Sequence, residues 1–148
     1  MNLSIKINQT LIILLVMIMF GVLSSCSSPA PVEPTQPPDR VDVVYFYDSE
    51  ICQCEAAPGV RIQGTLYINF SKELANGQLT FQSIDINDPN YAAITNKYRA
   101  KSLSLFLNVV RGDTEQTVAV PEIVLVKDDD EAIGRLIVDR ISKYFEVD

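Results

Sequence analysis

Histidine and tryptophan are absent from this sequence of 148 residues, and cysteine occurs only three times. Without histidine, neither a Ser-His-Asp triad nor a Cys-His pair can form, which excludes the nucleophilic hydrolases that depend on them. No glycine-rich loop follows a strand-like run, so a phosphate-binding loop is not expected. Cations are also few, with 12 lysines and arginines against 19 acids. We therefore expect no nucleic acid partner and no cofactor.

Residues 1–25 have the layout of a secretory signal, because Lys6 precedes an apolar run from Leu11 to Leu23. The run ends at Leu23-Ser24-Ser25-Cys26. This tetrapeptide resembles the bacterial lipoprotein box, whose cysteine receives diacylglycerol and acyl chains such as palmitate and becomes the new N-terminus. The resemblance implies lipidation at Cys26. A transmembrane anchor is the alternative, but the run is shorter than the roughly 18 residues that a span needs.

A proline-rich stretch follows Cys26 and has too little apolar surface to fold, which predicts an extended tether. The expected organisation is a signal peptide at 1–25, the lipidated cysteine and tether at 26–40, and one domain at 41–148. The domain would be lipid-anchored at the cell membrane, on its extracytoplasmic side. Position 27 is Ser and lacks the aspartate that retains many Gram-negative lipoproteins in the inner membrane, so sorting to the outer membrane stays open in such a cell. In a cell with a single membrane, the same signal would place the domain on its outer face.

Apolar periodicity predicts the elements of the domain. Residues 41–47 are almost continuously apolar, as in a central strand covered on both faces. Ile62, Leu66, Phe70 and Leu74 recur every four residues and predict a helix that Asn76-Gly77 ends. We further expect a strand at 79–85, a helix from Asn87-Asp88-Pro89 to Tyr98, strands at 103–110 and 114–120 joined by a glycine turn, and a final helix from 128 to 144. The structure of the run from Pro121 to Val126 is ambiguous. Its residues favour a strand, whereas the proline suggests an edge strand or a short detour.

This order of elements, with two cysteines after the first strand, resembles the thioredoxin fold. The resemblance implies an α/β domain of three layers, with a central mixed sheet of about four strands flanked by helices. Tyr45-Phe46, the turn from Phe70 to Leu79 and the segment from Asp85 to Pro89 are also similar to small bacterial thioredoxin-like proteins. Members of that group are often labelled nitrophenyl compound nitroreductase subunits. No flavin or nicotinamide motif appears in this chain, so we take only the fold from this group.

Cys52 and Cys54 are the only thiols left once Cys26 is lipidated, and an oxidising compartment favours their pairing. By the resemblance, Cys52 is the attacking and Cys54 the resolving cysteine of a thiol–disulfide oxidoreductase that acts with an envelope redox partner or substrate protein. Their spacing is one residue shorter than Cys-x-x-Cys. In an extended chain their Cα atoms would lie about 6.6–7.2 Å apart, so the loop must bend to reach the roughly 4.4–6.8 Å of a disulfide. We expect such a strained pair to be oxidising or isomerising.

The cysteine loop departs from the thioredoxin pattern. Thioredoxins carry a cis-proline before the third strand, where this chain has residues 101–104 without proline, and a buried acid in the first strand, where it has Phe46. Pro58-Gly59 leaves open whether a helix begins at the cysteines. The candidate modulators of the pair are three acids, which disfavour a thiolate, and one serine: Asp48, Glu50, Glu55 and Ser104.

Two other functions stay open at this point. Two thiolates suit copper(I), zinc or arsenite, although a tetrahedral zinc site would need further ligands such as Glu50 or a second chain. The other function is that of a redox-inert thioredoxin fold that binds an envelope partner, with its cysteines as a passive structural bridge.

Overall fold

The computed structural model describes residues 37–145. The predicted signal peptide, Cys26 and most of the predicted tether lie outside the described residues. Between residues 37 and 145, no helix is long and apolar enough to span a membrane.

Seven helical segments and four strands make up the described domain. In chain order they are β1 (Arg40–Tyr47), η1 (Gln53–Ala56), α2 (Ala57–Asn69), α3 (Ser71–Ala75), β2 (Leu79–Asp85), η2 (Pro89–Tyr91), α4 (Ala92–Tyr98), β3 (Ser104–Arg111), β4 (Thr114–Ala119), α5 (Ile123–Val126) and α6 (Asp130–Phe145).

The four strands form one mixed sheet in the order β2-β1-β3-β4. β1 pairs with β2 in parallel and with β3 in antiparallel register, and β3 pairs with β4 in antiparallel register. The parallel pair needs a crossover, which α2 and α3 supply, whereas β3 and β4 form a hairpin whose turn places Gly112 at φ 53°. This order and these directions are those of the thioredoxin-like fold, so the predicted fold class is confirmed.

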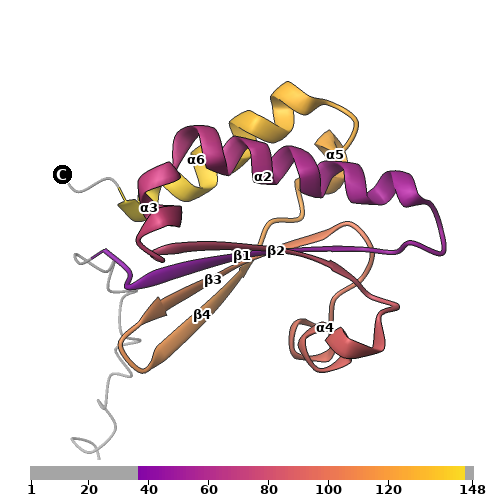
Figure 1. The fold of residues 1–148 in the computed structure, drawn as a ribbon, viewed down its shortest axis with the longest axis horizontal. Helices are drawn as coiled ribbons and strands as arrows, with labels where there is room; N and C mark the ends of the chain where they lie inside the picture. Colours follow the sequence, from indigo (N-terminus) through magenta and orange to yellow (C-terminus); the bar gives the residue numbers. More distant parts are fainter. Residues whose placement is uncertain (1–36, 146–148) are drawn as a thin grey trace, which may run out of the picture. The chain divides into compact units, whose positions relative to one another are not determined.

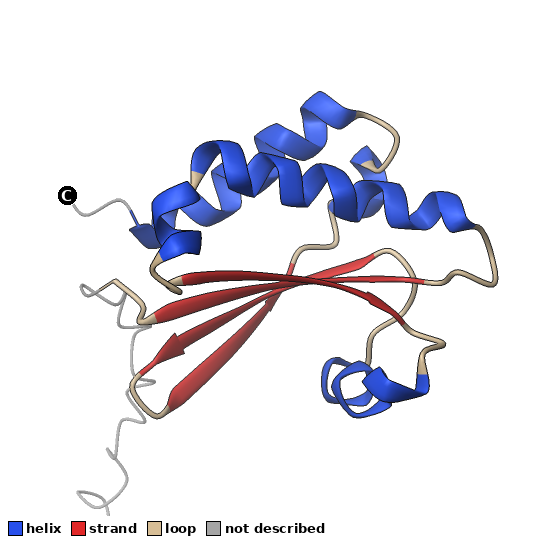
Figure 2. Cartoon of the chain, viewed as in Figure 1, coloured by secondary structure: helices blue, strands red, loops and turns tan. Residues whose placement is uncertain are grey.

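Helices cover both faces of the sheet, with α2 and α6 on one face and α4 on the other (Figures 1 and 2). Alternate residues of β1 therefore enter two separate clusters. Val43 and Tyr45 pack with Ile62, Leu66 and the buried isoleucines of α6. The second cluster holds Val44, Phe46 and Ile84 beneath α4. The expectation of a central strand covered on both faces is confirmed.

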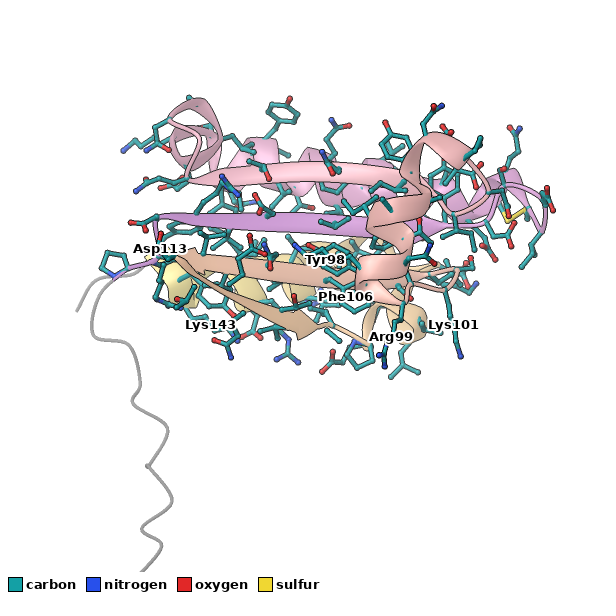
Figure 3. All side chains as sticks on the ribbon, turned by 90° about the horizontal axis from the view of Figure 1, so that it is seen from below. Tyr98, Arg99, Lys101, Phe106, Asp113 and Lys143 are labelled. Atoms are coloured by element: carbon teal, nitrogen blue, oxygen red, sulfur yellow. A yellow bond between two sulfur atoms is a disulfide. The ribbon has the colours of Figure 1, made fainter. Side chains whose placement is uncertain are left out.

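The second cluster is built largely from aromatic rings. Tyr98 of α4 and Phe106 of β3 lie with their ring centroids 5.1 Å apart (Figure 3), and Phe46 lies 5.6 Å from Tyr98. Such pairs stabilise a core beyond the area that they bury. Phe46 is therefore a packing residue.

One local prediction differs from the structure, and one segment that the sequence does not decide forms a helical turn. The stripe from Ile62 to Leu74 predicts one helix, but the helix breaks at Phe70 (φ −131°, ψ 35°), which ends α2 and begins α3. The open segment after Pro121 contains α5, a helical turn that buries Ile123. Its β-branched residues favour a strand, and the burial of Ile123 overrides that local preference.

Candidate functional site

Cys52 and Cys54 form a disulfide in the loop between β1 and α2. Figure 3 shows the sulfur–sulfur bond at one end of the domain, beyond the ends of the strands. Their Cα atoms are 5.1 Å apart, so the bend that the short spacing requires is present. Cys52 is extended (φ −162°, ψ 130°), and the 3-10 turn η1 starts immediately after it. Helical structure therefore begins at the cysteines and continues directly into α2, which contains Pro58 and Gly59.

Asp48 organises the start of this loop. Its Oδ1 accepts hydrogen bonds from the backbone N–H groups of Glu50 (2.9 Å) and Ile51 (3.3 Å), and from the side chain of Asn87 (2.6 Å). Its carbonyl oxygen accepts the N–H of Cys52 at 3.4 Å. Asp48, predicted as a modulator of the pair, is held by these contacts as a structural part of the loop, whereas Glu50 is exposed.

The loop is also fixed to the end of β2. The carboxylate of Asp85 accepts a short hydrogen bond from the hydroxyl of Ser49, and further bonds from the N–H groups of Ser49 (3.4 Å) and Asn87 (3.1 Å). The Ser49 bond is the main cause that holds the pKa of Asp85 below its ordinary value, followed by the Asn87 N–H. The parallel pairing of β1 and β2 brings these residues to one sheet edge, which gives the cysteine loop a rigid base.

Glu55 joins the loop to the turn before β3. Its carboxylate accepts the N–H of Asp48 at 3.2 Å and a short hydrogen bond from the hydroxyl of Ser102. The predicted modulator Ser104 does not make this contact; its Oγ accepts the N–H of Lys101 at 3.2 Å. Sequence reasoning missed Ser102, because it lies 47 positions from Glu55 and no local spacing links the two.

The carbonyl oxygen of Glu55 accepts a hydrogen bond of 2.7 Å from the hydroxyl of Tyr45. Tyr45 is fully buried in β1. Burial is the main cause that raises its pKa far above the ordinary value, and the charge of Glu55 raises it further. The phenol therefore stays protonated and keeps this bond between the sheet and the first helical turn.

Leu103 lies in the turn before β3, where the resemblance implies a cis-proline, and lines the same cavity as Cys54. The described residues contain no cis peptide bond, and Leu103 instead adopts the left-handed conformation with φ 58°. This conformation costs a residue with a Cβ about 1–2 kcal/mol. Strain of this kind is found most often at functional sites. The turn beside the cysteine loop thus contains a left-handed residue in place of the cis-proline that the resemblance implies.

A cavity of about 320 Å³ opens beside Cys54. Its apolar lining includes Ala57, Pro58 and Leu103. Its charged lining is largely paired, since Arg61 binds Asp130 at 3.0 Å and Lys127 binds Asp128 at 2.5 Å. Cys54 is exposed and lines this cavity, whereas Cys52 is half-buried and does not. A molecule in the cavity would therefore meet the disulfide at Cys54.

The described residues contain no group of three or more cysteine, histidine or acidic side chains arranged to hold a metal ion. In this structure both sulfur atoms are bonded to each other. A metal would thus require the reduced pair, and a tetrahedral ion such as zinc would also require further ligands.

Reduction of the disulfide is expected to cost little stability. A ring that closes over one intervening residue removes little chain entropy from the unfolded state, about 1.6 kcal/mol on the loop-length relation. Urea unfolding of the chain with and without a reductant measures the difference, and the Cys52→Ser, Cys54→Ser double variant should match the reduced protein. A loss of about 4 kcal/mol or more, which is near the upper end of what native disulfides contribute, would identify the disulfide as a structural bridge.

Comparison with known proteins adds a distant likeness. No protein-family model matches the chain, and no curated protein matches it. Among solved structures, the solution structure of a thioredoxin from Thermus thermophilus is similar over 64% of this chain and 79% of its own, with 16% identity and a TM-score of 0.38. The strand order, the strand directions and the helices on both faces characterise the domain more directly. They identify a thioredoxin-like fold that carries a Cys-x-Cys disulfide between its first strand and first helix.

Proposed function

We propose that this protein is a thiol–disulfide oxidoreductase of the cell envelope, anchored to the membrane through lipid on Cys26. The observation that supports this most is the position of the disulfide. Cys52 and Cys54 close an accessible loop beside an open cavity, and rigid contacts from Asp48 and Glu55 hold the loop on both sides. A buried structural bridge needs neither exposure nor a cavity.

The proposed reaction is disulfide exchange with a dithiol of a substrate protein. One substrate thiolate attacks a sulfur of the Cys52–Cys54 bond, which breaks and leaves its electron pair on the other cysteine. The second substrate thiolate then displaces the enzyme sulfur from the mixed disulfide. The substrate gains a disulfide, and Cys52 and Cys54 gain two electrons as thiols. A disulfide-bearing envelope partner takes up those electrons and restores the pair.

The surface next to the pair suits a polypeptide substrate. Ile51 directly precedes Cys52 and is 68% exposed. The cavity beside Cys54 adds the apolar side chains of Pro58 and Leu103. An unfolded or extended segment that presents cysteine next to apolar residues would contact both parts of this surface.

The direct test is exchange activity against a model protein with scrambled or reduced disulfides. The wild-type chain is expected to accelerate oxidation of the reduced protein, and Cys52→Ser and Cys54→Ser are each expected to abolish that acceleration, because each leaves a single thiol that cannot form the internal disulfide. The control is a double variant that combines Ser71→Cys with Cys52→Ser. It again has two thiols, but they lie far apart in the chain, so it should remain inactive. Equal activity of Cys52→Ser and the wild type would falsify the enzymatic proposal.

The anchor is tested separately in bacterial cells. Cys26→Ser is expected to move the protein from the membrane fraction to the soluble fraction and to abolish incorporation of labelled palmitate, because two or three acyl chains on one residue account for stable anchoring. Cys52→Ser is the control and should stay with the membrane. Retention of the Cys26→Ser variant in the membrane would contradict lipid anchoring and leave the exchange activity unaffected.

A further inference from the structure

The two sulfur atoms of the disulfide lie in different environments. Cys54 is exposed and lines the cavity, while Cys52 is half-buried and does not line it. The Sγ of Cys52 accepts a hydrogen bond of 3.1 Å from the backbone N–H of Cys54. One sulfur is thus open to an incoming group, and the other already holds a donor that would stabilise negative charge.

The backbone fixes this difference. The carbonyl oxygen of Cys52 accepts the N–H of Glu55 at 3.0 Å, and the N–H of Cys52 donates to Asp48 at 3.4 Å. Cys52 is therefore held at both of its peptide groups. Because the donor to its sulfur is a backbone N–H, it is retained after the disulfide opens and in any side-chain variant at position 54 other than proline.

We propose that an incoming thiolate attacks Cys54 and that Cys52 is the leaving group. In this step the new bond joins the substrate sulfur to the Sγ of Cys54, the Cys52–Cys54 bond breaks, and its electron pair stays on Cys52 as a thiolate that the Cys54 N–H stabilises. A thiolate of lower pKa leaves faster, and hydrogen bonding to a charged form favours that form. The accessibility of Cys54 and the stability of the Cys52 thiolate thus both favour attack at Cys54.

This order reverses the one that the thioredoxin resemblance implies, in which the first cysteine forms the mixed disulfide. It rests on the proposed exchange activity and adds which residue carries the substrate. The carboxylate of Glu55 accepts its hydrogen bonds from the Asp48 N–H and the Ser102 hydroxyl, so the donor at the Cys52 sulfur is not shared with it.

The order is tested on the oxidised full-length chain in detergent. The protein is mixed briefly with glutathione, quenched with acid and alkylated, and the peptide containing both cysteines is fragmented in a mass spectrometer. Gln53 separates the two positions, so the glutathione adduct and the alkyl group can be assigned individually. Glutathione is expected on Cys54 and the alkyl group on Cys52, with roughly a tenfold preference, because a hydrogen bond to a charged group supports at least that factor.

A second measurement compares the thiol pKa of two single-cysteine variants from the pH dependence of their alkylation. Cys54→Ser keeps the backbone donor and should give Cys52 the lower pKa, while Cys52→Ser reports the pKa of Cys54. Adducts mainly on Cys52, adducts in equal amounts, or a higher pKa at Cys52 would each overturn the assignment while leaving exchange activity intact. No adduct at either position would reject the exchange activity itself and this assignment with it.

Discussion

Replacing Leu66 by alanine is expected to destabilise the domain by about 2–5 kcal/mol, because a buried leucine loses both its transfer free energy and its packing partners. Leu66 lies in α2 and is fully buried in the cluster between the sheet and α6. A small domain has a total stability of only about 5–15 kcal/mol. Urea unfolding, followed by far-UV circular dichroism, measures the loss as a lower midpoint at an unchanged slope.

Leu125 offers the matched control. The same change, Leu125→Ala, removes the same atoms from a side chain that is 85% exposed in α5. Its effect on the free energy of unfolding is expected to stay within about 0.5 kcal/mol. If both variants lost the same stability, the placement of Leu66 in the core would be wrong.

Alanine at Gly59 is expected to destabilise the domain by about 1–3 kcal/mol, the usual cost of overpacking a close contact. Gly59 is in the first turn of α2, and a Cβ there would lie 2.7 Å from the hydroxyl oxygen of Ser83 and 2.9 Å from the ring of Tyr45. Ser83 can rotate away, but the buried ring of Tyr45 cannot. The helix would have to move off the sheet, and the cysteine loop that precedes it would move as well.

Gly64, in the same helix, is expected to respond with the opposite sign. No atom lies within 4 Å of a Cβ built there, so Gly64→Ala only improves helix propensity, by about 0.5–1 kcal/mol. The two variants share one chemical change and one helix, and thermal unfolding ranks them directly. A Gly59→Ala variant as stable as Gly64→Ala would show that α2 does not pack against β1 at this point.

The sequence predicts the elements whose signals are local. Ile62 and Leu66 recur at helical spacing and are buried as expected. The side chain of Asp88 caps η2 by accepting the N–H of Asn90 at 2.9 Å, as the Asn87-Asp88-Pro89 pattern predicts. The order of these elements leaves few topologies open, because short crossovers between strands are right-handed. Together with the resemblance to the thioredoxin fold, this order predicts the mixed sheet without coordinates.

The parts that the sequence does not predict depend on contacts between distant segments. Tyr67 and Tyr91 lie at core spacing, yet they are 62% and 41% exposed, because periodicity does not show how wide the covered stripe of a helix is. Ser102, and not Ser104, donates to Glu55, and the left-handed turn at Leu103 lies between the two serines. The steric requirement for glycine at position 59 is visible only once α2 is placed against Tyr45.

The ring closed by Cys52 and Cys54 spans a single residue, Gln53, while the contacts that hold the loop to the sheet pass through Asp48, Asp85 and Tyr45. Opening the disulfide changes covalent connectivity at the tip of the loop and leaves those contacts in place. We therefore expect the oxidised and reduced forms to share one scaffold and to differ over a patch of a few atoms. We expect any protein that distinguishes the two forms to bind that patch itself, because these contacts between the loop and the described sheet do not include the sulfur atoms.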